Sequence, residues 1–96
     1  MLFRHALGET IRELRHEQGL TLRQVSKMSC VALGYLSEVE RGHKEASSEI
    51  VAGIANSLNV STARLVIMAG YRIGGLDLVP NTAQELLDTA SDLVSR

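Results

Sequence analysis

Apolar residues recur three or four positions apart along almost the whole sequence, and no stretch alternates apolar with polar residues as a strand would. This periodicity predicts an all-α fold. The first helix is expected at residues 3–18, with an apolar face formed by Phe3, Leu7, Ile11 and Leu14. With 96 residues, 45% of them hydrophobic, the chain is expected to have a single core, since one domain usually takes about 100 to 200 residues.

Residues 21–42 predict two short helices joined by a tight turn. Thr21 and Gln24 have the spacing of a capping box, in which the two side chains satisfy free backbone N–H groups at the start of a helix. We expect this helix at about residues 22–30 and the next at about 32–41. The turn around Val31 that joins them spans only three or four residues when the flanking helix ends are included, so the segment is predicted to be a helix-turn-helix.

Two further helices complete the predicted domain. The fourth is expected to begin at Ser47 or Ser48, and the fifth is expected to follow the capping residue Ser61 and to end at Gly70. Residues 1–70 are thus predicted to form a five-helix domain.

The remainder of the chain is predicted to be a separate association element. Residues 71–81 contain a glycine pair and the only proline, which predicts an apolar connector, and Thr82 with Glu85 forms a second capping box that opens an amphipathic helix. We expect residues 71–96 to mediate dimerisation, with an interface formed by Leu76, Leu78, Leu86, Leu87, Ala90, Leu93 and Val94. The alternative is that this helix folds back onto the core of its own chain.

The distribution of charge and the single cysteine indicate how the chain is organised and in which compartment it is expected. Residues 1–44 hold seven Lys or Arg against five Glu, whereas residues 45–96 hold three Arg against six Asp or Glu, so the two halves differ in sign. The single cysteine, Cys30, excludes a disulfide within one chain and is typical of a reducing compartment. The N-terminal segment lacks the apolar stretch of an export signal, and a cytoplasmic location is expected.

No catalytic constellation emerges from the sequence. The histidines His5, His16 and His43 lack the spacing of a metal site, and no serine or cysteine can be matched with a base and an orienting group. The chain is therefore not predicted to be an enzyme, and no metal or cofactor is expected. Met28 and Cys30 are interpreted as buried packing residues.

The segment TLRQVSKMSCVALGYLSEVERG, at residues 21–42, resembles the helix-turn-helix of the lambda-repressor-like, or XRE, family, and the likeness extends over residues 7–70. More narrowly, LGYLSEVERGHKEASSEI, at residues 33–50, resembles the Clp-gene regulator (ClgR) subfamily of actinobacterial transcriptional activators, whose targets include genes of Clp protease components. The resemblance implies that the second helix of the helix-turn-helix enters the DNA major groove.

The resemblance also implies roles for single residues. Contacts with base edges fall to Leu33, Gly34, Ser37 and Glu38. Contacts with phosphates fall to Thr21, Leu22, Arg23, Tyr35, Arg41 and Lys44. For Tyr35, packing against the preceding helix is the alternative. Arg15 and Glu40 occupy positions at which the family forms a partly buried ion pair, and their role is interpreted as structural.

Two residues depart from the family pattern. Ala32 stands where the family usually has a serine cap, and Gly34 lies inside the helix that would contact bases. Each is expected to weaken that helix by about 1 kcal/mol.

The resulting hypothesis is a homodimeric transcription factor that binds a palindromic operator and activates Clp protease and stress genes. Two recognition helices set one DNA turn apart multiply the discrimination that a single helix provides. The expected partners are double-stranded DNA, a second copy of the chain, RNA polymerase and Clp protease. Two alternatives stay open: an antitoxin or autoregulatory repressor of the same fold, and a protein-interaction module that has lost DNA binding.

Overall fold

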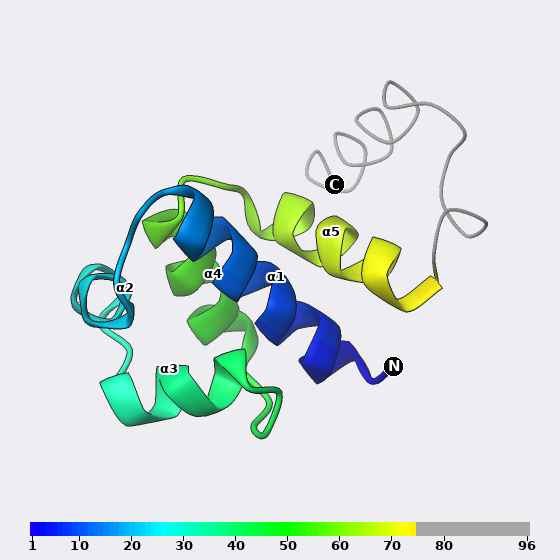
Figure 1. Ribbon diagram of the computed structural model, residues 1–96, viewed down its shortest axis with the longest axis horizontal. Helices are drawn as coiled ribbons and strands as arrows, with labels where there is room; N and C mark the ends of the chain where they lie inside the picture. Colours follow the sequence, from blue (N-terminus) through cyan, green and yellow to red (C-terminus); the bar gives the residue numbers. More distant parts are fainter. Residues whose placement is uncertain (75–96) are drawn as a thin grey trace.

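The computed structural model describes residues 1–74, which form five helices and contain no strand (Figure 1). The helices are α1 (Phe3–Glu17), α2 (Leu22–Ser29), α3 (Leu33–Glu40), α4 (Ser48–Ser57) and α5 (Thr62–Gly74). The prediction of an all-α, five-helix domain is confirmed. The predicted dimer interface lies outside the described residues and stays a prediction; its members are Leu76, Leu78, Leu86, Leu87, Ala90, Leu93 and Val94.

Helix α1 organises the domain, because it packs against both α3 and α5. Figure 1 shows α2 and α3 at one side of the domain and α5 at the other, with α1 and α4 between them. The largest fully buried side chains come from every helix and include Ile11, Val25, Leu36, Ile54 and Leu65. The helix-turn-helix is therefore built onto the same core as the rest of the domain.

Three apolar residues lie further out than the sequence suggested. Phe3 is 46% exposed and Met28 is 50% exposed, and Cys30 is exposed as well. The interpretation of Met28 and Cys30 as buried packing residues is therefore wrong. Cys30 ends α2 in the left-handed conformation, with φ at 60°, so its position is set by the turn and not by the core.

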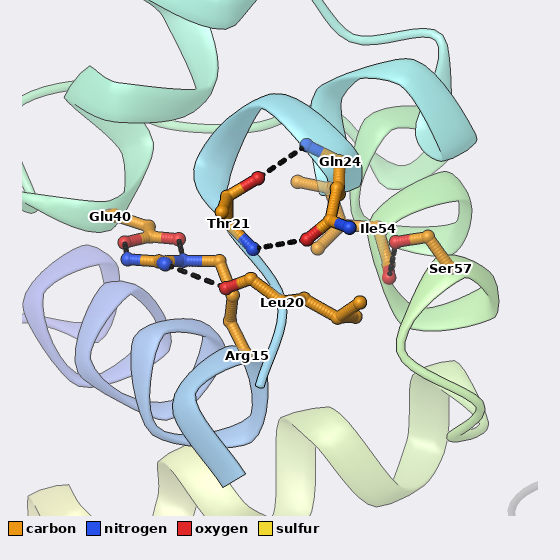
Figure 2. A network of polar contacts seen from close by, with 7 residues as sticks. All are labelled: Arg15, Leu20, Thr21, Gln24, Glu40, Ile54 and Ser57. Atoms are coloured by element: carbon orange, nitrogen blue, oxygen red, sulfur yellow. Dashed lines mark hydrogen bonds and ion pairs between the residues drawn. The ribbon is translucent and has the colours of Figure 1, made fainter. Parts of the chain in front are cut away.

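The side-chain caps begin three helices as predicted. The Thr21 hydroxyl accepts from the Gln24 N–H (3.1 Å), and the Gln24 side-chain oxygen accepts from the Thr21 N–H (2.7 Å), which completes the capping box (Figure 2). Ser47, not Ser48, caps α4 by accepting from the Ile50 N–H. Ser61 accepts from the N–H of Arg64 in the first turn of α5.

Helix α5 does not end at Gly70, as the sequence suggested, but continues to Gly74. The added turn carries Arg72, whose Nε donates to the Thr10 hydroxyl (2.9 Å) and whose guanidinium pairs with Glu9 and Glu13 on α1. These tertiary contacts outweigh the low helix propensity of the glycine. Among residues 1–74, no single helix is long and apolar enough to cross a membrane, and α4 with α5 reaches that composition only as a pair bent by 98°.

Two glycines allow α1 and the end of α3 to come into backbone contact. A Cβ on Gly8 would lie 2.5 Å from the carbonyl oxygens of both Val39 and Glu40, closer than real Cβ contacts come. Gly42 follows α3 in the left-handed conformation, with φ at +76°, and its carbonyl accepts from Arg4 Nε (3.0 Å). The position of α3 is therefore set by direct contact with α1.

Candidate nucleic-acid interface

The turn between α2 and α3 is short, and contacts with the core and with α2 fix its position. Its residue Val31 is 4% exposed and packs in the core, and the Ser26 hydroxyl donates to the Val31 carbonyl. Val25, on the inner face of α2, is fully buried beside it. Ser26 was not predicted to have this role, because the sequence of a helix does not show that a serine within it will bind a carbonyl in the following turn.

An ion pair between Arg15 on α1 and Glu40 on α3 links the helix-turn-helix to α1 (Figure 2). Arg15 Nε lies 2.8 Å from Glu40 Oε2, and Arg15 Nη2 lies 3.0 Å from Oε1, so the pair is bidentate. A third donor, Nη1, binds the carbonyl of Leu20 just before α2 (3.0 Å). The side chains of Arg15 and Glu40 are 13% and 6% exposed. One guanidinium thus ties α1 to α3 and to the start of α2.

The predicted base-contacting residues lie together on the outward side of α3. Gly34, Ser37 and Glu38 are three and four residues apart, so they share one face of the helix. Gly34 is exposed, and Ser37 and Glu38 are partly exposed, whereas Leu36 and Val39 on the opposite side are buried. Leu33, at the first position of α3, is partly buried. Helix α3 therefore buries one side in the core and leaves the other side accessible.

The structure sorts the predicted phosphate-contacting residues into two groups. Arg23, Arg41 and Lys44 are exposed cations, and neither Arg23 nor Lys44 forms an ion pair within residues 1–74. Thr21 and Leu22 lie at the N-terminus of α2, where backbone N–H groups favour anions. The Leu22 side chain packs against the core, which leaves its backbone N–H for this role.

Tyr35, for which a phosphate contact and packing were both predicted, packs within the domain. Its hydroxyl donates to the carbonyl of Glu45, ten residues later, and its ring packs against the core. A phenol has one proton, and in this structure the Glu45 carbonyl accepts it, so the phosphate contact stays a prediction. Tyr35 therefore holds the segment that follows α3.

Glu38 is the most constrained of the predicted base-contacting side chains. His43 Nδ1 lies 2.9 Å from Glu38 Oε2, and Arg41 Nη1 lies 3.9 Å from Oε1. His43 was not among the predicted site residues because it follows the end of the helix. Gly42 was a sequence signal for this contact, because the residue that follows a helix-closing glycine is directed back toward the last turn of the helix.

The start of α3 has the weaknesses that the sequence suggested. Ala32 is the N-cap and provides no side-chain hydrogen bond. A Cβ on Gly34 would meet open space, so no close approach requires a glycine there. Neither of these residues contributes to the order of α3, which depends on its packing and on the Arg15–Glu40 pair. Within residues 1–74, no three His, Cys, Asp or Glu side chains form a group that could hold a metal ion.

Comparisons with known proteins agree with this geometry. The model of the helix-turn-helix family HTH_3 matches residues 11–65. The transcriptional regulator ClgR of Mycobacterium tuberculosis strain H37Rv is 46% identical over 72 residues, which are 75% of this chain and 64% of that protein. The chain therefore spans less than two thirds of the length of this relative.

Solved structures show the same likeness. The crystal structure of the clp gene regulator ClgR from C. glutamicum has a TM-score of 0.73 and 43% identity, and the match covers 78% of this chain and 97% of that one. The restriction-modification controller protein C.AhdI from Aeromonas hydrophila has a TM-score of 0.63 and 27% identity, with 65% and 94% covered. ClgR is named as a regulator in both comparisons, in agreement with the prediction that this chain is not an enzyme.

Proposed function

Because this chain belongs to the helix-turn-helix family HTH_3, we propose that it is a sequence-specific DNA-binding transcriptional regulator, with α3 as the helix that enters the major groove. The supporting observation is that one side of α3 is accessible and the other is buried. Gly34, Ser37 and Glu38 face outward, while the opposite side is anchored in the core and by the ion pair of Arg15 with Glu40. A helix held in this way presents its outer side chains in one fixed geometry, which base recognition requires.

The chemistry of the outer face assigns different tasks to different side chains. Ser37 can donate to or accept from several bases, and Glu38 can accept from a cytosine amino group. Leu33 offers only an apolar contact, which suits a thymine methyl group. Phosphate contacts, which position the protein without specifying sequence, are assigned to the exposed cations Arg23, Arg41 and Lys44.

The finer proposal is a homodimer that binds a palindromic operator and activates Clp protease and stress genes. The likeness to proteins named as clp gene regulators supports the choice of target genes. The dimer is supported by the eight-residue length of α3, because one such helix contacts few base pairs and a second copy multiplies the discrimination. Residues 71–96 remain the proposed dimerisation element, although residues 71–74 form the last turn of α5 and not part of the predicted connector. RNA polymerase and Clp protease remain the proposed protein partners.

The experiment that tests this function is selection of bound duplexes from a random pool, followed by gel-shift titration at two salt concentrations. We expect an inverted repeat with half-sites about one helical turn apart, and binding that weakens steeply as salt rises. Recovery of no sequence above the background would favour the protein-interaction module. Copurification of a small toxin that occupies the C-terminal segment would favour the antitoxin.

Separate substitutions should distinguish phosphate contacts from base contacts. Arg23→Ala is expected to weaken binding to operator and random DNA alike and to lower the salt slope by about 1, since one phosphate contact is lost. Ser37→Ala is expected to change the preferred base at one position of each half-site. Titration of an operator panel measures both effects. Arg12→Ala is the matched control, because Arg12 is an exposed arginine on α1, outside the helix-turn-helix and beside Arg72 of α5. An equal loss on every sequence for Ser37→Ala would contradict its assignment.

Deletion of residues 81–96 is expected to convert a dimer into a monomer in analytical ultracentrifugation, because most of the proposed interface residues are removed. The melting temperature separates this result from the alternative. If the segment covers the core of its own chain instead, the deletion lowers the melting temperature and leaves the mass unchanged. A dimer that survives the deletion would place the interface on α5 and the connector.

A further inference from the structure

The end of α3 brings two polar side chains into contact outside the helix. The Gly42 N–H donates to the Val39 carbonyl (3.1 Å), and the His43 N–H donates to the Glu38 carbonyl (3.0 Å). These are the two backbone bonds of the Schellman motif, which the left-handed Gly42 makes possible. The chain therefore turns back on itself, and the His43 ring reaches the Glu38 carboxylate with Nδ1 2.9 Å from Oε2.

This contact differs from the usual form of the motif. The two residues joined by the longer backbone bond are commonly apolar and pack together, whereas here they are a histidine and a glutamate. Their side chains are 60% and 36% exposed, and an ion pair with such exposure contributes little to stability. The pair is therefore poorly explained as a fold-stabilising feature.

The contact with His43 limits the orientations that the Glu38 carboxylate can adopt. An ionised carboxylate only accepts hydrogen bonds, so His43 Nδ1 carries the hydrogen between them. Arg41 lies 3.9 Å from the second carboxylate oxygen, on the same C-terminal side of α3. Each oxygen has further lone pairs, so the held carboxylate can still accept from a group outside the protein.

We infer that His43 is a positioning residue that holds the Glu38 carboxylate toward the base edges and thereby creates a preference for cytosine at one position of each half-site. This inference rests on the proposed function. The carboxylate accepts from the cytosine amino group, which no other base pair presents at the same place in the major groove. Fixing its orientation before binding removes the cost of ordering a flexible side chain on the DNA. His43 acts through Glu38 and not through a base contact of its own.

The test compares the full chain with His43→Ala and His43→Asn on operators that carry each of the four bases at each half-site position. For His43→Ala we expect the cytosine preference to fall by about three- to fivefold at one position, with less than about a twofold change on random DNA. Asn places an N–H donor near the position of Nδ1, so His43→Asn should restore most of the preference. In a Glu38→Ala background, His43→Ala should have no further effect on base preference.

The controls separate positioning from other roles. His16→Ala removes an exposed histidine on α1, in the groove beside Arg72, and should leave the base preference unchanged. A melting temperature of His43→Ala within about 2 °C of the parent shows that the fold is intact. An unchanged preference at every position, or an effect of His43→Ala that persists without Glu38, would overturn the inference. Absence of any selected sequence for the parent chain would instead remove the proposed function itself.

Discussion

Gly8→Ala is expected to lower the free energy of unfolding by about 3 kcal/mol, which is a large share of the stability of a domain of this size. The added Cβ would lie 2.5 Å from two backbone carbonyl oxygens, those of Val39 and Glu40. Backbone atoms cannot rotate away as the end of a side chain can, so α1 and α3 must separate. Urea unfolding followed by far-UV circular dichroism measures the loss.

Gly34→Ala is the matched control for this prediction, because Gly34 is also a glycine inside a helix and a Cβ there meets open space. Alanine has the higher helix propensity, so Gly34→Ala should raise the free energy of unfolding by up to about 1 kcal/mol. The two substitutions add the same atom and should have opposite effects. Similar urea midpoints for Gly8→Ala and the parent chain would show that α1 and α3 are less tightly apposed than the structure indicates.

Arg15→Ala is expected to cost about 3 to 5 kcal/mol, because it leaves the Glu40 carboxylate without its partner at 6% side-chain exposure. It also removes the donor to the Leu20 carbonyl, so α1 loses its link to the start of α2. We expect a lower melting temperature in calorimetry. The molecules that remain folded at low temperature should select the same operator as the parent chain, since Arg15 lies away from the outer face of α3.

Replacing both partners tests whether the cost comes from the unpaired charge. Arg15→Met combined with Glu40→Met removes both charges and keeps much of the apolar bulk, so the double variant should recover most of the stability lost in Arg15→Ala. Arg12→Ala, an exposed arginine on the same helix, should change the melting temperature little. A melting temperature for Arg15→Ala close to that of the parent would contradict a structural role for the pair.

Much of the helix-turn-helix was predictable because its signals are local. The Thr21–Gln24 capping box marks the start of α2 through hydrogen bonds between residues three positions apart. The burial of Leu36 and Val39 follows from helical periodicity, since an amphipathic helix must direct one stripe toward the core. Arg15 and Glu40 are 25 residues apart, and only the family resemblance indicated that they would meet.

Other features depended on contacts that no local pattern encodes. Met28 is an apolar residue but lies at the surface, because among residues 1–74 α2 packs mainly against α3 and α4 and leaves the side that carries Met28 exposed. Arg72 extends α5 beyond Gly70 by binding Thr10, sixty-two residues away. Gly8 offered a partial signal, since a glycine inside a helix is costly unless something requires the space.

The sequence by itself determined which segments are helical, where most of them begin and, for most of α1 and for α3, which side faces inward, because capping and periodicity act within a few residues. The tertiary structure alone decided how those helices are held against one another. The contact of Gly8 with the end of α3, the Arg72 link between α5 and α1, and the turn that brings His43 onto Glu38 all depend on distances in space. Those distances exist only after the chain has packed, because packing brings distant residues together in arrangements that local spacing does not specify.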